Sequence, residues 1–241
     1  MDDIFGMLDS TMLEMSIASE SIHMIDGTGC KYRPVFIILL YSDSGFDHIA
    51  EKFVKNQKYW HAAIGFGPAL STTYSFNFGE CEANARKGGL SYESMDFYKR
   101  EHPTGYCYIG CVLLSPQRFK KLEDNLNYYI KNKKKTKYSF INLFWSLIHK
   151  ERKVKKFSFV CSTFVDALLK SVDVDLNDEA NNLVKPDDLE SNNPNQIKIY
   201  EGSIVGYDAE KAARIVEKYA NNTNYAYFSR GGYSRFRGGG Q

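Results

Sequence analysis

An uninterrupted apolar run from Val35 to Tyr41 is rich in β-branched, leucine and aromatic side chains. A run of this length and composition predicts a buried β-strand. Further strand-like segments follow at 59–66, 70–78, 106–114 and 197–200, and the turn at Gly67 and Pro68 predicts that the first two of these form a hairpin. The strands are expected to pair as an antiparallel sheet in an α+β fold.

Helical patterns lie between these strand segments. They cover residues 47–56, 116–132, 161–172 and 208–221. Ser115 is placed to cap the second of these helices, because Pro116 then falls at the first helical position. Residues 79–97 are polar and contain glycine, which predicts a long loop with at most a short element.

Composition changes along the chain indicate four regions. Residues 1–33 are expected to form an N-terminal arm or cap, residues 34–207 the main domain, and residues 208–221 a C-terminal helix. Residues 222–241 are rich in glycine, arginine and tyrosine, which is typical of a flexible tail.

The overall charge excludes few partners but gives no support to nucleic-acid binding. The formal net charge is +2, so any basic interaction surface must be local. The run from Lys131 to Lys137 and the arginines of the tail are the candidates, and a solvated helix end and a flexible or protein-docking terminus are the favoured interpretations. Nucleic acid is therefore an unlikely partner.

The sequence also predicts neither a metal nor an organic cofactor. The five cysteines are an odd number with irregular spacing, which argues against a secreted disulfide framework, and no His or Cys pair completes a zinc site. The acidic residues of the first 21 positions do not fit a secretory leader, and no apolar run is long enough to span a bilayer. We expect a protein used in the cytoplasm or packaged in a virion.

Cys161 is the candidate nucleophile. Apolar residues follow it at helical spacing, including Phe164, Val165 and Leu168, which places Cys161 at or near a helix N-terminus. There the helix dipole and free backbone N–H groups favour the reactive thiolate and can stabilise an oxyanion. A cysteine in this position is also often structural, so the hypothesis needs a base.

His61 is the candidate base. In a strand over 59–66, His61, Ala63 and Gly65 share one face. Because the other residues on this face are small, we expect a helix N-terminus to approach His61 from that side. A core histidine bonded to a backbone carbonyl is the alternative interpretation.

Three blocks of sequence together resemble the circularly permuted branch of the papain-like superfamily, which is related to NlpC-type cell-wall peptidases and lecithin:retinol acyltransferase. They are W-H-A-A-I-G-F beginning at Trp60, T-Y-S-F-N-F-G beginning at Thr73, and F-V-C-S-T-F-V-D-A-L-L beginning at Phe159, the last followed by K-P-D-D-L and I-Y-E-G. The resemblance covers residues 34–207 and implies a permuted papain-like fold, in which an antiparallel sheet packs against the nucleophile-bearing helix.

The resemblance implies a cysteine hydrolase with Cys161 as nucleophile and His61 as base. It also implies a third polar group on the strand after the histidine, where Asn77 and Ser75 share a face. Asn77 is the better candidate to orient the imidazole. No Asp, Glu or His lies in 70–78, so a dyad is the alternative. Peptide amides, including peptidoglycan, are the leading substrates and lipid acyl groups the second choice.

A non-catalytic role remains the competing hypothesis. The same fold can serve as an inactive scaffold in a larger assembly such as a phage particle, docking to other proteins through its terminal arms. The two hypotheses differ in whether the Cys161 sulfur lies within reach of the His61 ring.

Overall fold

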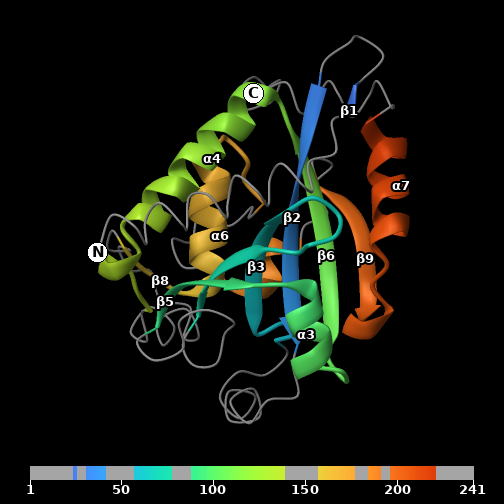
Figure 1. Ribbon diagram of the computed structural model, residues 1–241, viewed down its shortest axis with the longest axis horizontal. Helices are drawn as coiled ribbons and strands as arrows, with labels where there is room; N and C mark the ends of the chain where they lie inside the picture. The colour runs from blue at the N-terminus through green and yellow to red at the C-terminus, as the bar shows by residue number, and fades with distance from the viewer. Residues whose placement is uncertain are drawn as a thin grey trace, which may run out of the picture.

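The computed structural model describes residues 24–25, 31–41, 57–77, 88–138, 157–176, 184–190 and 196–220. The predicted helix 47–56, nearly all of the predicted N-terminal arm and the tail 222–241 lie outside these ranges. Within them the chain has the α+β architecture that the sequence predicts (Figure 1).

Six antiparallel strands form the central sheet in the order β5-β4-β3-β2-β6-β9. Their bounds are β2 Lys31–Tyr41, β3 His61–Phe66, β4 Thr73–Asn77, β5 Gly89–Glu93, β6 Tyr106–Leu114 and β9 Ile197–Ser203. A short strand β1 (Met24–Ile25) pairs with the start of β2, and β7 (Lys137–Tyr138) pairs with β8 (Ser158–Phe159) in a separate parallel ribbon. The predicted hairpin is the antiparallel pair β3–β4.

Strand β2 is central because both of its faces are apolar. Val35, Ile37 and Leu39 point into one core, whereas the alternate residues Phe36 and Ile38 point into the other, and all five are fully buried. The strand begins at Lys31, three residues before the predicted domain start. Pro34 is tolerated in β2 because it is paired with β6 only: the pairing of β2 with β3 begins at the next residue, Val35.

Helices cover both faces of the sheet. Their bounds are α3 Met95–Glu101, α4 Pro116–Lys131, α6 Cys161–Lys170 and α7 Ala209–Ala220. Helices α4 and α6 contribute to the core on the Val35 face, and α3 and α7 to the core on the Phe36 face. Figure 1 shows α4 and α6 on one side of the strands and α7 beside β9 on the other.

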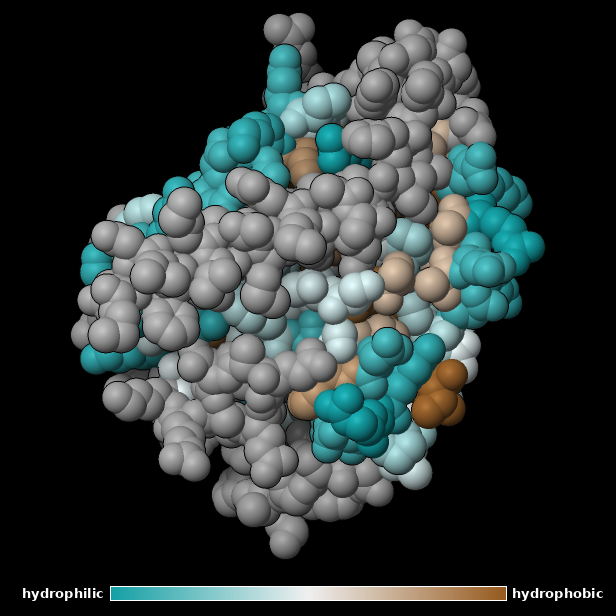
Figure 2. Space-filling view, viewed as in Figure 1, coloured by the Kyte–Doolittle hydropathy of each residue, from teal (hydrophilic) through white to brown (hydrophobic). Residues whose placement is uncertain are grey.

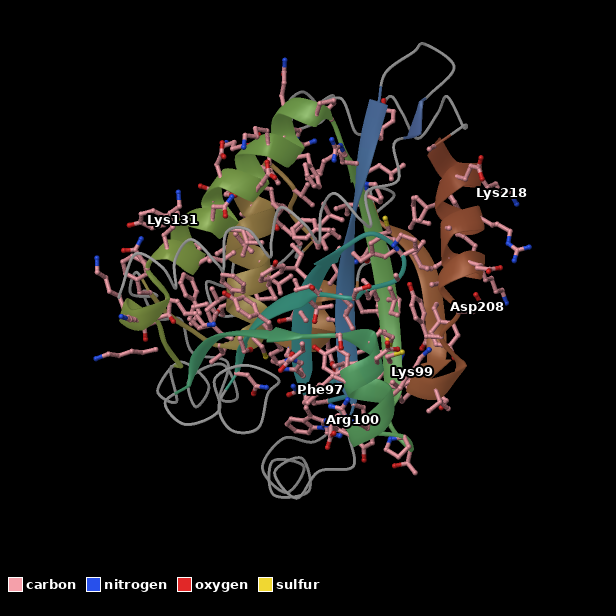
Figure 3. The ribbon with its side chains drawn as sticks, viewed as in Figure 1. Phe97, Lys99, Arg100, Lys131, Asp208 and Lys218 are labelled. Atoms are coloured by element: carbon pink, nitrogen blue, oxygen red, sulfur yellow. The ribbon has the colours of Figure 1, made fainter. Side chains whose placement is uncertain are left out.

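The helix ends follow the expected chemistry. Ser115 Oγ accepts a hydrogen bond from Arg118 N at 3.4 Å, which confirms the predicted cap of α4. Asp208 Oδ1 accepts from the backbone N–H groups of Glu210 and Lys211 at the start of α7, and Lys99 Nζ of α3 donates to the Tyr207 carbonyl at 3.0 Å (Figure 3). The outward surfaces of α4 and α7 are hydrophilic (Figure 2).

The prediction of a loop over 79–97 is wrong for its last part. Residues 89–93 form β5 and α3 begins at Met95, after its cap Ser94. Leu90 and Tyr92 alternate into the core with the polar Ser91 between them, but the strand has only five residues and follows a long polar, glycine-containing stretch that favours a loop. Within the described ranges, no helix combines the length and apolar character that crossing a bilayer requires.

Candidate active site

Cys161 is the first residue of α6, as its sequence pattern predicts. The helix is held in the core by Phe164 and Val165, both fully buried. Thr163 Oγ1 accepts from Val160 N and also donates to Val160 O, each at 3.1 Å, which fixes the backbone just ahead of the thiol. Val160 at the N-cap supplies no side-chain acceptor, so the first-turn N–H groups are not capped by it.

His61 is the first residue of β3 and meets Cys161 at the end of the sheet. The Cys161 side chain lies close enough to the His61 imidazole to help raise the pKa of His61, and its thiol donates to the carbonyl oxygen of Trp60 at 4.0 Å. The structure therefore brings together the two residues that the sequence singles out, although they lie on separate elements.

A carboxylate completes the arrangement. Glu93, the last residue of β5, places Oε2 at 3.0 Å from His61 Nε2. Its side chain is 1% exposed and that of His61 is 20% exposed, so this pair lies mostly out of water. The imidazole thus lies between the thiol and the carboxylate and is hydrogen-bonded to the carboxylate.

Two further side chains hold the carboxylate in place. The Tyr98 hydroxyl of α3 donates to Glu93 Oε2 at 2.5 Å, and Asn77 Nδ2 donates to Oε1 at 2.7 Å. Thr73 Oγ1 donates to the Glu93 carbonyl at 3.0 Å and lies 3.3 Å from the Tyr98 hydroxyl. A buried carboxylate with several donors is both oriented and stabilised in its charged form.

The electrostatics of the pair follow from this geometry. Burial by itself lowers the pKa of His61, but the charge and hydrogen bond of Glu93 and the nearby Cys161 side chain outweigh burial and raise that pKa to about 10. Burial likewise tends to raise the pKa of Glu93, yet His61, Tyr98 and Asn77 hold it below its ordinary value. Burial and the Glu93 charge raise the pKa of Tyr98 well above its usual range, so Tyr98 remains a donor.

The two residues proposed for the third position have other neighbours. Asn77 lies beside the Glu93 carboxylate, and Ser75 is fully buried, where its hydroxyl donates to the Ala62 carbonyl at 2.7 Å. The expectation that the third group lies on the strand after the histidine needs correction, because the carboxylate that engages His61 comes one strand further, from β5.

The approach of the helix also differs from the prediction. Helix α6 shares its core with Ala62, Ile64 and Phe66, and not with the small-residue face of Ala63. Cys161 still lies beside His61 because the histidine is the first residue of its strand, so the helix N-terminus can approach it from the end of the strand.

Sequence reasoning missed Glu93 because it lies in the segment interpreted as a loop. Two signals mark it: the alternation of Leu90 and Tyr92, which predicts that Glu93 shares a face with Ser91, and the capping serine Ser94 directly after it. Neither signal identifies the partner of the carboxylate.

The other cysteines that the structure describes do not share this environment. Cys107 and Cys111 are fully buried in the opposite core, and burial raises the pKa of Cys107 to about 12 and that of Cys111 further still. Cys30 and Cys81 lie outside the described ranges. In the part of the chain that the structure describes, no cluster of three or more His, Cys, Asp or Glu side chains is arranged to hold a metal ion.

The structure thus defines an α+β protein with a thiol, an imidazole and a carboxylate in series. No protein-family model matches the chain, and neither does any curated protein or solved structure.

Proposed function

We propose that this chain is a cysteine hydrolase of the circularly permuted papain-like type. The observation that carries the proposal is the arrangement of Cys161, His61 and Glu93, in which the imidazole lies close to a thiol at a helix N-terminus and is hydrogen-bonded to a buried carboxylate. The order of the site, with the histidine strand ahead of the cysteine helix, and the packing of the sheet on that helix support the permuted fold.

The proposed reaction uses each group for one task. Glu93 engages Nε2 of His61, which leaves Nδ1 to exchange a proton with the thiol. The Cys161 thiolate attacks the carbonyl carbon of an amide, thioester or ester, and the backbone N–H groups at the start of α6 stabilise the resulting oxyanion. The imidazolium then protonates the leaving group, and an acyl-thioester remains on Cys161.

Water completes the cycle. His61 takes a proton from a water molecule whose oxygen attacks the acyl carbon, and the released cysteine sulfur regains a proton from the imidazolium. The products are a carboxylic acid and the original enzyme. Peptide amides, including those of peptidoglycan, are the proposed first substrates and lipid acyl groups the second.

One observation favours the inactive scaffold as a second candidate. Cys161 is 5% exposed, so a substrate carbonyl has little direct access to the sulfur in this conformation. The two candidates differ in whether the thiol is activated, and a reagent smaller than any substrate can test this.

The test is the pH profile of iodoacetamide alkylation at Cys161, measured by peptide mass spectrometry. A free thiol reacts roughly tenfold faster per pH unit below about pH 8.5, because the thiolate is the nucleophile. Limited access lowers the whole profile but does not change its shape. We expect a nearly flat profile between about pH 6 and pH 9, because the imidazolium favours the thiolate.

Matched variants separate the two candidates. His61→Ala should restore the steep profile of a free thiol, whereas Cys107 and Cys111 in the same protein should stay unmodified until it unfolds, because they are fully buried. A steep wild-type profile at Cys161, or no reaction until unfolding, would refute the hydrolase and leave the scaffold.

A further inference from the structure

The segment from Val184 to Glu190, here called the bridge segment, contacts both halves of the candidate site. It contains the short 3-10 helix η2 (Pro186–Leu189). Val184 and Leu189 are fully buried and belong to the same core as α6 and the Ala62 face of β3. The segment is therefore anchored firmly rather than lying on the surface.

One end of the bridge segment is bonded to the nucleophile helix. Ser162, the residue after Cys161, donates its hydroxyl to the Val184 carbonyl at 2.6 Å, and Ser162 is 1% exposed. This buried bond links the first turn of α6 to the start of the bridge segment, directly beside the thiol.

The other end is bonded to the chain entering the histidine strand. The Asp187 carboxylate accepts two successive backbone N–H groups, that of Lys58 at 2.8 Å on Oδ2 and that of Tyr59 at 2.7 Å on Oδ1. The next N–H, of Trp60, donates to the Leu40 carbonyl of β2 at 2.8 Å. Asp187 thus holds the two residues that precede the sheet pairing of β3.

Two other contacts constrain this end of β3: pairing with β2 fixes His61 relative to Leu40, and α6 packs on the Ala62 face of the strand. The bridge segment adds a polar link between the strand end and α6, because its Val184 end is bonded to Ser162 and its Asp187 side chain to Tyr59. A bidentate charged acceptor resists displacement more than a single neutral bond.

We propose that Asp187 is a positioning residue that sets the approach of the His61 imidazole to the Cys161 sulfur. The inference rests on the proposed function, because positioning matters only if the two groups exchange a proton. Asp187 bonds backbone groups and not the reacting atoms, so it acts through the placement of His61 and not as a catalytic residue.

The experiment compares three variants of the full chain. Asp187→Ala removes both acceptors, and Asp187→Asn keeps one carbonyl oxygen for one of the two N–H groups. Glu190→Gln is the matched control: it lies in the same segment and removes a charge, but Glu190 contacts the side chain of Lys58, at 3.3 Å, and not its backbone. Cooperative urea unfolding identifies the variants that remain folded.

Two readouts report positioning. One is the alkylation pH profile of Cys161, and the other is the His61 pKa measured by NMR titration of the labelled imidazole. In Asp187→Ala we expect the profile to steepen, the rate near neutral pH to fall at least about tenfold, and the His61 pKa to fall, because a displacement of about 1 Å is enough to uncouple such a pair. Asp187→Asn should change both in the same direction by less, and Glu190→Gln should change neither.

The outcomes distinguish the two proposals. A flat wild-type profile that persists in both Asp187 variants overturns the positioning role and leaves the hydrolase standing. A uniform fall in rate without a change in profile shape, or an equal effect of Glu190→Gln, also overturns it, because either one indicates altered access or a general loosening of the segment. A steep wild-type profile overturns both. If Asp187→Ala does not fold, Asp187→Asn decides the question by the same criteria.

Discussion

Replacing Glu93 by glutamine removes one negative charge from the candidate site and keeps the size of the side chain. Oε2 of Glu93 accepts from His61 and Tyr98, and Oε1 accepts from Asn77. A glutamine carbonyl oxygen in place of Oε2 retains the first two bonds, and a rotated Asn77 amide can accept from the new NH2 group. The variant is therefore expected to fold with its hydrogen bonds retained and its electrostatics changed.

The magnitude follows from the distance between the charges. At an effective dielectric constant of about 20, unit charges about 4 Å apart interact by about 4 kcal/mol, equivalent to about three pKa units. The His61 pKa of about 10 is the balance of this attraction, the influence of the nearby Cys161 and the opposing effect of burial. Without the carboxylate we expect the His61 pKa to fall to about 7.

The assay is NMR titration of the labelled His61 imidazole in wild type and Glu93→Gln, with Cys161 alkylation measured on the same samples. Glu101→Gln is the matched control, because Glu101 is 44% exposed and paired with Arg100 on the surface of α3. In Glu93→Gln the alkylation profile should become steeper toward neutral pH, whereas Glu101→Gln should match wild type. A fall in the His61 pKa of less than about one unit would refute the electrostatic role of Glu93.

Three other predictions concern stability. The folded pKa of His61, about 10, lies above its ordinary value of 6.5. The protonated imidazole therefore contributes fully to the free energy of unfolding below pH 6.5, and this contribution is lost as the pH rises toward 10. Urea unfolding should show a loss of up to about 4 kcal/mol over this range in wild type but not in His61→Gln. Phe164→Ala should cost about 3–5 kcal/mol in the same assay, because the ring is fully buried, and a cost below about 1 kcal/mol would contradict its place in the core. In Gly105→Ala the new methyl group would lie 2.5 Å from Ile204 Cδ1 and within 3.0 Å of two backbone carbonyl oxygens. That crowding should lower the free energy of unfolding by about 1–3 kcal/mol, and an unchanged free energy would show that the backbone yields there.

Much of the secondary structure follows from local sequence. The apolar run of β2, the hairpin of β3 and β4, the Ser115 cap of α4 and the helix that begins at Cys161 are all present as predicted. Each of these signals depends on residues close together in the chain, where periodicity and capping chemistry determine the element. The predicted pairing of Cys161 with His61 needed one assumption more, that the two elements meet.

The third member of the site was decided by tertiary structure. Glu93 ends a five-residue strand within a segment that the sequence predicts as a loop, and it meets His61 only because β4 lies between β5 and β3 in a particular register. Asp187 reaches Tyr59 across a sequence separation of 128 residues for the same kind of reason.

The sequence by itself determined most of the described strands and helices, β5 and α3 excepted, and which thiol and imidazole stand at the ends of such elements. Only the tertiary structure decided which carboxylates join them and from which face the helix approaches. The physical reason is that a local pattern fixes the direction of a side chain relative to its own element. The pairing register and packing of distant elements, which depend on burying the whole core at once, fix what that side chain meets.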